Sequence, residues 1–537
     1  MALPLAILAA AAVVAIFVVQ SIYSVFFSPL ARIPGPKLYA FTSWRLAYDD
    51  WCGARTRNFY KLHQKYGPAV RVGPNEVSFS SLASLRTIYG AGSGFERTSF
   101  YKMFEVYGRK NMFTFGPGRD HAARKKMVAN AYAKSTMLKG TIADLVEDKA
   151  RNYLDLIEAS DNRTSEIFAS LHYFSLDSIT QFLYGDAGAT ACLTGSPQHR
   201  ALINDIIDKA RRRLSWFSVH MPDFINAVYA QTGLAGAIAE RYFYPMAKPT
   251  TYSGIREYAM HAVERFGKHA AHKSLDEIER EPSVIAKLWK YHAHEKRADN
   301  DLDDTDIAAE CADHLLAGID TTSDTLMFLV WLLSRPENKK FQEKIIQEAR
   351  SVSADSINVH GVTRAAAADK LPYLDAVIKE TLRLFPPLPG SEPRLSRATT
   401  TIDGYVVPAN TCVSISPFVL QRNADVFQDP FMFNPDRWVD DSLNTAEMNR
   451  WFWAFSSGGR MCIGMHLAMA EMTTLASSIY RKYRTVPTDG FDKISPGITS
   501  RYEVLCDDSC EDMREHECRI QFQLLDAGLG AIKGSGK

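Results

Sequence analysis

The segment Phe455–Gly464 constrains this chain more than any other, because it places one cysteine in an unusual setting. Cys462 lies two residues after an arginine, between glycines, and at the start of an apolar pattern with helical spacing. Gly458 and Gly459 allow the backbone to turn tightly and to approach a flat ligand closely. Backbone N–H groups at the start of a helix favour a thiolate over a thiol. The segment therefore predicts a tight loop that presents Cys462 as a thiolate.

Two neighbouring side chains fit this interpretation. Arg460 can reach an anionic group such as a carboxylate, and Phe455 can shield the sulfur from water and tune its donor strength. A cysteine beside a helix is structural far more often than reactive, so the loop alone does not decide the chemistry. The chain has 8 cysteines in 537 residues, which is too sparse for a disulfide framework and leaves any one of them free to be a thiolate.

A second motif combines a helix with a later loop. Glu380 and Arg383 lie on one face of a helix predicted over residues 373–385, where they can pair. The segment Phe433–Trp438 carries Arg437, a further basic residue. An isolated pair of this kind is common on protein surfaces and contributes little to stability.

A third motif, Ala317–Thr322, lies inside a long helix predicted over Asp304–Ser334. A glycine and two threonines in mid-helix weaken the backbone hydrogen bonding and can open a kink that admits water. The Asp320 carboxylate beside the Thr321 hydroxyl could relay protons. Alone, the segment is more typical of a helix that packs through small residues.

Together, the pattern Phe-x-x-Gly-x-Arg-x-Cys-x-Gly and these two motifs, in this order, resemble the cytochrome P-450 family of haem-thiolate monooxygenases. The resemblance runs from about residue 30 to the C-terminus and implies a cytochrome P-450 fold with Cys462 as the axial ligand of haem b iron. A thiolate ligand favours O–O cleavage. The resemblance also implies that Asp320 and Thr321 steer protons to dioxygen. Further implied contacts are cofactor binding by Phe455, Gly458, Arg460 and Gly464, and a structural triad of Glu380, Arg383 and Arg437 behind the haem loop.

The family pairs the haem propionates with basic residues, and the resemblance assigns His121 and Arg394 to this role. The tryptophan that usually precedes an arginine by four residues is replaced by Asp120, so Lys125 or Arg124 is a further expectation. Substrate contacts are expected by position in three segments and include Phe104, Phe113, Phe115, Asp313, Leu388 and Pro389. An aromatic and apolar lining suits a hydrophobic small molecule.

The N-terminal segment is not typical of a globular domain. Residues Ala2–Val19 carry no charged side chain and would span about 27 Å as a helix, close to a hydrocarbon core of ~30 Å. A cleaved signal peptide is the alternative, but it would need a positive segment before the apolar run. Positive charges instead follow, at Arg32, Lys37 and Arg45, and predict a single-pass protein of the endoplasmic reticulum membrane with a cytosolic catalytic domain.

Three regions follow from this pattern. Residues 1–27 form a transmembrane anchor, residues 28–46 a proline-rich linker, and residues 47–537 one large catalytic domain that no second linker interrupts. Further helices are predicted over residues 337–353 and 463–483. Strands are predicted at residues 70–72 and 77–79 and around the Asp403-Gly404 turn. The fold class is therefore mainly α with small β-sheets.

The function that the resemblance implies is insertion of one oxygen atom of O2, by hydroxylation or epoxidation, into a hydrophobic small molecule. Similarity to filamentous-fungal members suggests a secondary-metabolite intermediate such as a polyketide, terpenoid or alkaloid. The chain has no dinucleotide-binding fingerprint, so NADPH electrons would arrive through NADPH–cytochrome P-450 reductase, with cytochrome b5 as a second donor. The formal net charge of +1 provides no basic excess for nucleic acid.

Two other functions remain open at this point. A haem-thiolate isomerase or dehydratase would use the same loop without external electrons, and a non-catalytic haem sensor would not need the Asp320–Thr321 pair. A zinc site at Cys506, Cys510, His516 and Cys518 is also imaginable. The intervening acidic run is more typical of a solvated loop, in a hairpin that ends at residues 519–525.

Overall fold

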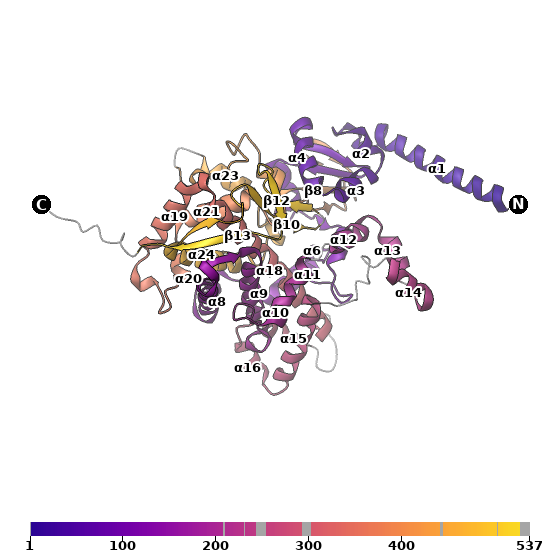
Figure 1. The fold of residues 1–537 in the computed structure, drawn as a ribbon. Coiled ribbons are helices and arrows are strands. Elements are labelled where there is room, and N and C mark those ends of the chain that lie inside the picture. The colour runs from indigo at the N-terminus through magenta and orange to yellow at the C-terminus, as the bar shows by residue number, and fades with distance from the viewer. Residues whose placement is uncertain are drawn as a thin grey trace.

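The computed structural model describes residues 2–207, 210–229, 231–242, 254–292, 302–440, 444–501 and 503–526. Helices dominate this part of the chain (Figure 1). The longer ones are α1 (Ala2–Phe26), α3 (Trp44–Trp51), α4 (Arg55–Tyr66), α5 (Leu82–Tyr89), α6 (Gly118–Val128), α8 (Gly140–Ala159), α9 (Ile167–Tyr184), α12 (Ala210–His220), α13 (Pro222–Tyr229), α14 (Gly233–Tyr242), α15 (Ile255–Ala270), α18 (Asp304–Ser334), α19 (Lys339–Ser351), α21 (Pro372–Leu384) and α24 (Met465–Lys482).

Helix α18 is the central element and begins and ends where the sequence predicts. Asp303 caps it by accepting a hydrogen bond from the Asp306 N–H, and the Asp306 side chain accepts one from the Asp303 N–H. The helix ends at Ser334, just before Arg335 and Pro336. It packs against α9, α15, α21 and α24, so the two largest apolar clusters both include it.

Two apolar clusters meet along α18. Residues 326–333 belong to one, together with α8, α19, α21 and α24, while Ile307 to Ile319 belong to the other, together with α15. Trp331 anchors the first cluster, since its indole N–H donates to the Phe491 carbonyl at 2.7 Å. The segment 317–322 therefore lies at the boundary between two rigid halves of the core.

Four small sheets complete the domain. The largest has the strand order β1-β2-β8-β5-β3 and the others are β11-β10-β12, β4-β13-β9 and β6-β7. Both predicted N-terminal and central hairpins are present, as β1–β2 and β6–β7, and Asp403 and Gly404 both have positive φ at the second turn. The strands are β1 (Ala69–Gly73), β2 (Glu76–Phe79), β3 (Glu96–Arg97), β4 (Thr164–Glu166), β5 (Arg394–Leu395), β6 (Thr400–Ile402), β7 (Tyr405–Val407), β8 (Cys412–Ile415), β9 (Tyr483–Pro487), β10 (Ile494–Ser500), β11 (Glu503–Leu505), β12 (Asp512–Glu515) and β13 (Arg519–Leu524).

The C-terminal hairpin prediction is wrong. Strand β13 pairs with β9 and β4, which lie far from it in the sequence, and β12 pairs in parallel with β10. Pairing across the core gives β13 two partners instead of the one that a hairpin would give. Cys518 is buried in the core between these sheets, while Cys506 and Cys510 are only partly buried.

Helix α1 extends away from the rest of the molecule (Figure 1). Residues Ile7–Phe26 have a mean hydropathy of 2.2 and are long enough to cross a membrane. The following segment folds back onto the domain, because Leu30 and Ile33 are buried against the first sheet and the Arg71 N–H donates to the Pro34 carbonyl at 2.8 Å. Helix α18 also has sufficient length and hydropathy, but most of it is buried as a core helix.

Candidate functional site

The loop that carries Cys462 is held by the backbone on both sides. A short 3-10 helix, Gly458–Arg460, precedes the cysteine, and α24 begins three residues after it. The Cys462 N–H donates to the Phe455 carbonyl at 2.9 Å. Gly458 has φ +64°, and a Cβ there would overlap the Tyr89 carbonyl oxygen. The close approach that glycine permits at 458 is therefore to the chain after α5.

The Cys462 side chain is accessible although the protein surrounds it. Desolvation raises the pKa of its thiol, while the backbone N–H groups of Gly464 and Met465 and the ammonium of Lys125 act in the opposite direction. Lys125 donates to the carbonyls of Gly459 and Met461 at 3.1 Å each. The start of α24 and the ammonium of Lys125 thus favour the thiolate form of Cys462, and Lys125 directly contacts the cysteine loop.

Basic side chains from four segments converge near this loop: Arg97, His121, Arg394 and Arg460. All are partly or fully buried. Burial, together with Arg97 and Arg394, lowers the pKa of Arg460 to about 9, and burial lowers that of Arg97 to about 10. Burial and the neighbouring guanidiniums lower the pKa of His121 to about 3, so this imidazole is neutral. The cluster is a concentrated positive charge that an anionic group would stabilise.

Hydrogen bonds to the backbone orient two of these arginines. Arg460 donates to the carbonyls of Phe115 and Gly116 at 2.8 and 2.6 Å. Arg97 donates to those of Met112 and Phe113, and its guanidinium lies over the Phe113 ring. One loop, residues 112–116, therefore positions both cations.

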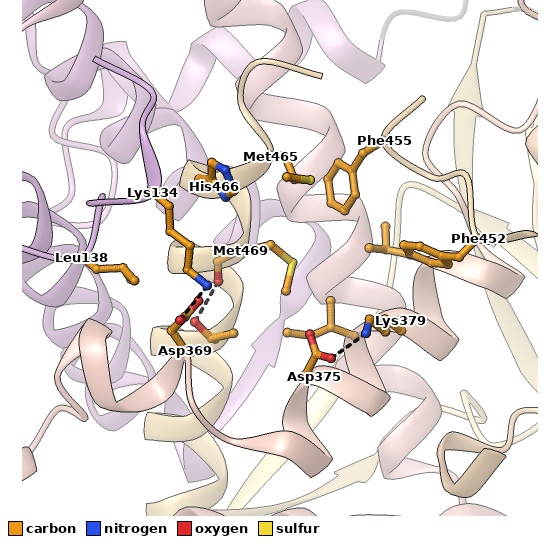
Figure 2. A pocket seen from close by; sticks show the side chains of 13 residues that line it. Lys134, Leu138, Asp369, Asp375, Lys379, Phe452, Phe455, Met465, His466 and Met469 are labelled. Atoms are coloured by element: carbon orange, nitrogen blue, oxygen red, sulfur yellow. Dashed lines mark hydrogen bonds and ion pairs between the residues drawn. The ribbon is translucent and has the colours of Figure 1, made fainter. Parts of the chain in front are cut away.

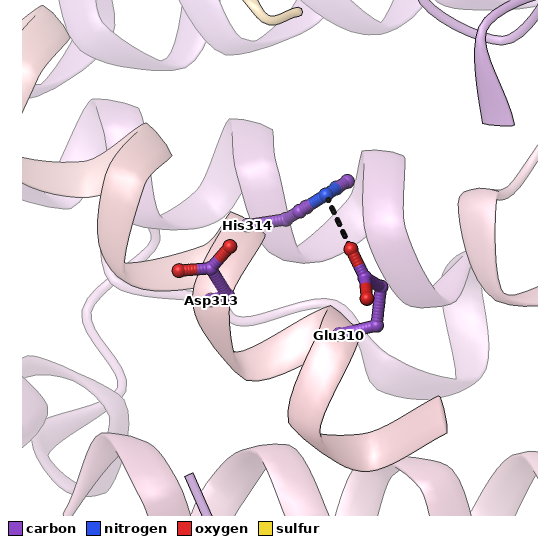
Figure 3. Close-up of side chains that lie close together, drawn as sticks. All are labelled: Glu310, Asp313 and His314. Atoms are coloured by element: carbon purple, nitrogen blue, oxygen red, sulfur yellow. Dashed lines mark ion pairs between the residues drawn. The ribbon is translucent and has the colours of Figure 1, made fainter. Parts of the chain in front are cut away.

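Arg124 does not join this cluster. Its guanidinium pairs with the buried carboxylate of Glu310 on α18 at 2.6 Å. Among the residues that the structure describes, Glu310, Asp313 and His314 form the one close group of metal-ligating side chains (Figure 3). Because Arg124 already neutralises Glu310, and the hydroxyl of Tyr132 lies 2.7 Å from His314 Nδ1, we interpret the group as an ion-pair network between α6 and α18.

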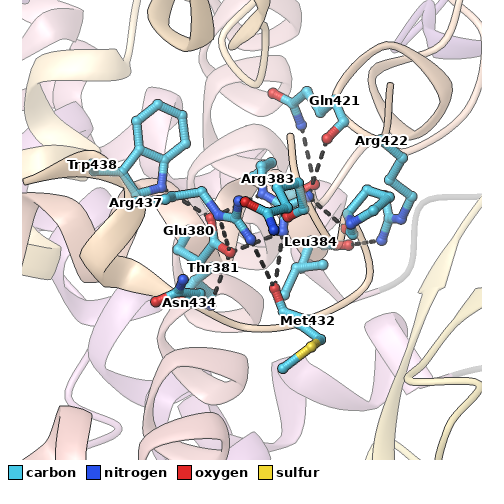
Figure 4. A network of polar contacts seen from close by, with 12 residues as sticks. Glu380, Thr381, Arg383, Leu384, Gln421, Arg422, Met432, Asn434, Arg437 and Trp438 are labelled. Carbon is cyan, nitrogen blue, oxygen red and sulfur yellow. Dashed lines mark hydrogen bonds and ion pairs between the residues drawn. The ribbon is translucent and has the colours of Figure 1, made fainter. Parts of the chain in front are cut away.

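The three residues Glu380, Arg383 and Arg437 are fully buried and lie together (Figure 4). Arg383 donates to both carboxylate oxygens of Glu380 at 2.9 Å, and Arg437 donates to one of them at 3.1 Å. Burial disfavours the charged carboxylate, yet the two guanidiniums hold the pKa of Glu380 below its usual range. Further donors to Glu380 are the Asn434 N–H and the Trp438 indole, at 3.0 and 2.9 Å.

The arginines of this group fix the chain between α22 (Pro417–Leu420) and the cysteine loop. Arg383 donates to the carbonyls of Gln421, Pro430 and Met432. Arg437 donates to the Gln428 carbonyl at 2.9 Å. A single buried carboxylate thus organises the whole stretch from residue 421 to residue 438.

Asp320 and Thr321 lie in an unbroken part of α18. The Thr321 hydroxyl donates to the Ala317 carbonyl at 2.7 Å, and that of Ser323 to Ile319 at 2.8 Å. These bonds give the backbone carbonyls a second donor without interrupting the helix. Gly318 allows α9 to approach closely, because a Cβ there would overlap the Ile179 side chain.

Aromatic side chains gather beside the N-terminal half of α18. The rings of Phe104 and Phe113 are 5.1 Å apart, and those of Tyr101 and Phe113 are 5.3 Å apart. Asp313 lies next to Phe113, and its burial raises the pKa of its carboxyl to about 7. Of the other expected substrate contacts, Phe115 lies under the Arg124 guanidinium, and Leu388 is exposed.

On the other side of the cysteine loop lies a cavity of about 260 Å³ (Figure 2). Phe455 and Met465 line it, next to two ion pairs, Lys134–Asp369 and Lys379–Asp375, each at 2.9 Å. The side chain of Phe455 thus faces this cavity.

Comparison with known proteins agrees with this geometry. The family described as "Cytochrome P450" matches residues 34–501 of the chain. The chain belongs to the cytochrome P450 family. Its relatives include the cytochrome P450 monooxygenase stcB of Emericella nidulans, 30% identical over 86% of this chain and 84% of the relative. The cytochrome P450 monooxygenase aflV of Aspergillus parasiticus is 28% identical over 94% of both chains.

A haem-thiolate cofactor follows from membership of this cytochrome P450 family, and the donor set of the chain fits it. A thiolate on a helix start can hold the iron. The basic cluster of Arg97, Arg394 and Arg460 has the charge to hold two propionates: Arg394 is paired with Glu392 at 3.2 Å, whereas burial and the neighbouring guanidiniums lower the pKa of Arg97 and Arg460. The family identity and this fit do not favour a non-catalytic haem sensor.

Arg97 is the residue that the sequence analysis missed. It lies outside all three motifs, in the two-residue strand β3, which pairs with β5 at Arg394. The pairing of Arg97 with Arg394 across two strands depends on a long-range contact between segments almost 300 residues apart.

Proposed function

We propose that this cytochrome P450 is a membrane-anchored monooxygenase that inserts one oxygen atom of O2 into a hydrophobic small molecule, an intermediate of secondary metabolism. The observation that carries the proposal is that one chain contains Cys462, the basic cluster and the Asp320–Thr321 segment. The relatives of this chain include fungal cytochrome P450 monooxygenases. When bound, the haem supplies the activation of dioxygen. The residues of the chain would hold the haem, shield the Cys462 sulfur from water and deliver protons next to the haem.

Individual roles follow from position. Cys462 would hold the iron, with Phe455, Gly458 and Gly464 shaping its loop. Arg460, Arg394, His121 and Arg97 would hold the propionates, while Lys125 would keep the loop in place and favour the thiolate. Thr321 would hold a proton near the reacting oxygen, and Asp320 would resupply it. The Glu380–Arg383–Arg437 triad would keep the loop folded.

The substrate would lie between the aromatic side chains of residues 101–113 and α18. Phe104 and Phe113 offer apolar faces and Asp313 offers one carboxyl of altered pKa. This lining supports a hydrophobic skeleton with at least one polar group, as a polyketide, terpenoid or alkaloid has.

Electrons would come from NADPH through NADPH–cytochrome P-450 reductase, with cytochrome b5 as a second donor. Helix α6 supports this choice, because it carries Arg119, Lys125 and Lys126 against one acidic residue, Asp120, and Lys125 contacts the cysteine loop directly. A basic helix beside the cysteine loop suits an acidic electron carrier.

The membrane arrangement follows the same reasoning. Residues 1–27 would anchor the protein in the endoplasmic reticulum, residues 28–46 would link it, and residues 47–537 would form the cytosolic catalytic domain. Burial of Leu30 and Ile33 supports a stiff link that fixes the orientation of the domain relative to the membrane.

NADPH consumption by microsomes that contain this protein and a reductase tests the proposal. A monooxygenase consumes NADPH and O2 in step with product, whereas an isomerase or dehydratase forms product without NADPH. Product formation that is independent of NADPH would overturn the proposal, and mass spectrometry after incubation in ¹⁸O2 would show whether the inserted atom comes from O2.

A further inference from the structure

A buried histidine faces two carboxyl groups where α9 packs against α18. His172 is fully buried on α9, and its Nε2 lies 3.9 Å from Asp320 Oδ1 and 3.8 Å from Asp324 Oδ1. The two acids are one helical turn apart on α18, so both reach the same imidazole edge. Within the described part of the chain, neither His172 Nε2 nor Asp324 Oδ1 has a hydrogen-bond partner.

The other nitrogen of His172 decides how this imidazole edge is protonated. His172 Nδ1 lies 2.7 Å from the Phe168 carbonyl oxygen, which can only accept, so Nδ1 carries a proton. In a neutral imidazole, Nε2 is then an acceptor. An acceptor that faces two carboxylates would be repelled by both, and therefore one further proton must lie among the three groups.

Burial determines which group holds that proton. The side chain of Asp324 is 8% exposed, whereas that of Asp320 is 42% exposed. A charge costs more in the drier site, so the proton belongs on Asp324 and the charge on Asp320. Burial and the neighbouring Asp320 raise the pKa of Asp324 well above its usual range, and burial lowers that of His172 to about 4. The ring of His516 lies 5.0 Å from the Phe168 ring, and His516 also acts to lower the pKa of His172.

We propose that His172 and Asp324 are positioning residues for Asp320: the protonated Asp324 carboxyl donates to His172 Nε2, directly or through one water, and thereby leaves Asp320 ionised. The gap of 3.8 Å closes with a small side-chain rotation or one bridging water. Asp320 is then always ready to accept a proton and pass it to Thr321. The role of this pair in proton delivery rests on the proposed function, whereas the protonation state of Asp324 does not.

Infrared difference spectroscopy of the whole haem-loaded protein tests the protonation state without any substrate. The spectrum of the wild type minus that of Asp324→Asn should contain a positive C=O band of a neutral carboxylic acid, because the variant lacks this group. Asp177→Asn is the matched control, because Asp177 is also buried on α9 but accepts three hydrogen bonds, from Thr190 Oγ1 and the N–H groups of Cys192 and Leu193. That control should lose carboxylate bands alone. His172→Phe should move the Asp324 band to higher frequency, because its acceptor is gone.

Two results would overturn the assignment: loss of only carboxylate bands in Asp324→Asn, or an unmoved band in His172→Phe. The functional arm compares two substitutions of one residue. Asp324→Asn still donates to Nε2 and should keep the peroxide released per NADPH within twofold of wild type, whereas Asp324→Leu should raise it severalfold with an unchanged carbon monoxide difference spectrum. Equal values for both variants would contradict the positioning role. Absence of NADPH consumption in the wild type, with the infrared result intact, would instead contradict the proposed function.

Discussion

At the scale of single residues, the site depends on buried charges that the protein leaves partly uncompensated. Arg97, Arg394 and Arg460 lie close enough to oppose one another's ionisation, and no motif reveals the first of them. Evolving such a cluster is costly unless an anion occupies it, because burying an unpaired charge destabilises the fold. The cluster is therefore better evidence for a dianionic cofactor than any one basic residue.

We expect Arg97→Gln to weaken haem retention. A charge-assisted hydrogen bond contributes about 1.5–3 kcal/mol, which corresponds to roughly 10- to 100-fold in affinity. The measurement is the rate of haem transfer to an excess of apomyoglobin. Arg397→Gln is the control, since Arg397 is an exposed neighbour paired with Glu96 and should transfer haem at the wild-type rate. Equal rates for both variants would remove Arg97 from the site.

Thr321→Ala should retain the haem spectrum but divert electrons to hydrogen peroxide. Loss of a positioned proton donor costs about 10²-fold or more in a proton-transfer step, so unproductive release competes. The ratio of product to NADPH, with peroxide measured in parallel, reports this. Thr325→Ala is the control, because its hydroxyl makes the same type of bond, to the Thr321 carbonyl at 2.7 Å. An unchanged ratio in Thr321→Ala would show that the relay does not pass through this residue.

At the scale of secondary-structure elements, one carboxylate joins α21 to the loop that leads to Cys462. Glu380 accepts hydrogen bonds from Arg383, Arg437, Asn434 and Trp438. Removing one partner of a buried ion pair leaves the other charges without compensation, and this penalty exceeds the worth of any surface pair.

Glu380→Gln should lower the free energy of unfolding by about 3–5 kcal/mol and yield little haem-loaded protein. Lys379→Gln, at the preceding position of the same helix, breaks the more exposed pair with Asp375 and a contact with the Trp438 ring at 5.9 Å, and should change the stability by less than about 1 kcal/mol. Urea unfolding followed by the haem absorbance measures both. Similar midpoints for the two variants would contradict a structural role for the triad.

The sequence predicted these elements unevenly, for physical reasons. Helix α18 was predicted to the residue because its capping residue and terminating proline are local signals. The partners of β13 were not predictable, because strand pairing joins segments such as 164–166 and 519–521 that no local pattern connects. The same distinction holds in the site: Cys462 and Glu380 lie in motifs, whereas Arg97 and His172 reach their neighbours only through tertiary packing.

At the scale of the whole molecule, one sheet links the segment after α1 to the site. The chain after α1 packs onto the first sheet, and the same sheet contains Arg97 and Arg394. The segment after α1 and part of the basic cluster therefore belong to one sheet, on different strands of it.

Deletion of residues 2–27 should release the protein from microsomes without loss of the haem spectrum. The apolar segment spans a bilayer by length, while the core residues that hold the site lie beyond it. Extraction with alkaline carbonate separates integral from peripheral protein. Retention of the deleted form in the carbonate-resistant fraction would show that another segment anchors the chain.

The central claim is that Cys462 holds the haem iron as a thiolate. The most direct measurement is the difference spectrum of the reduced protein with and without carbon monoxide, for wild type and Cys462→Ser, at equal haem content. We expect the wild type to show the Soret band of a thiolate-ligated carbon monoxide complex and Cys462→Ser to lack it. A wild-type protein without that band, or a Cys462→Ser variant that keeps it, would contradict the account.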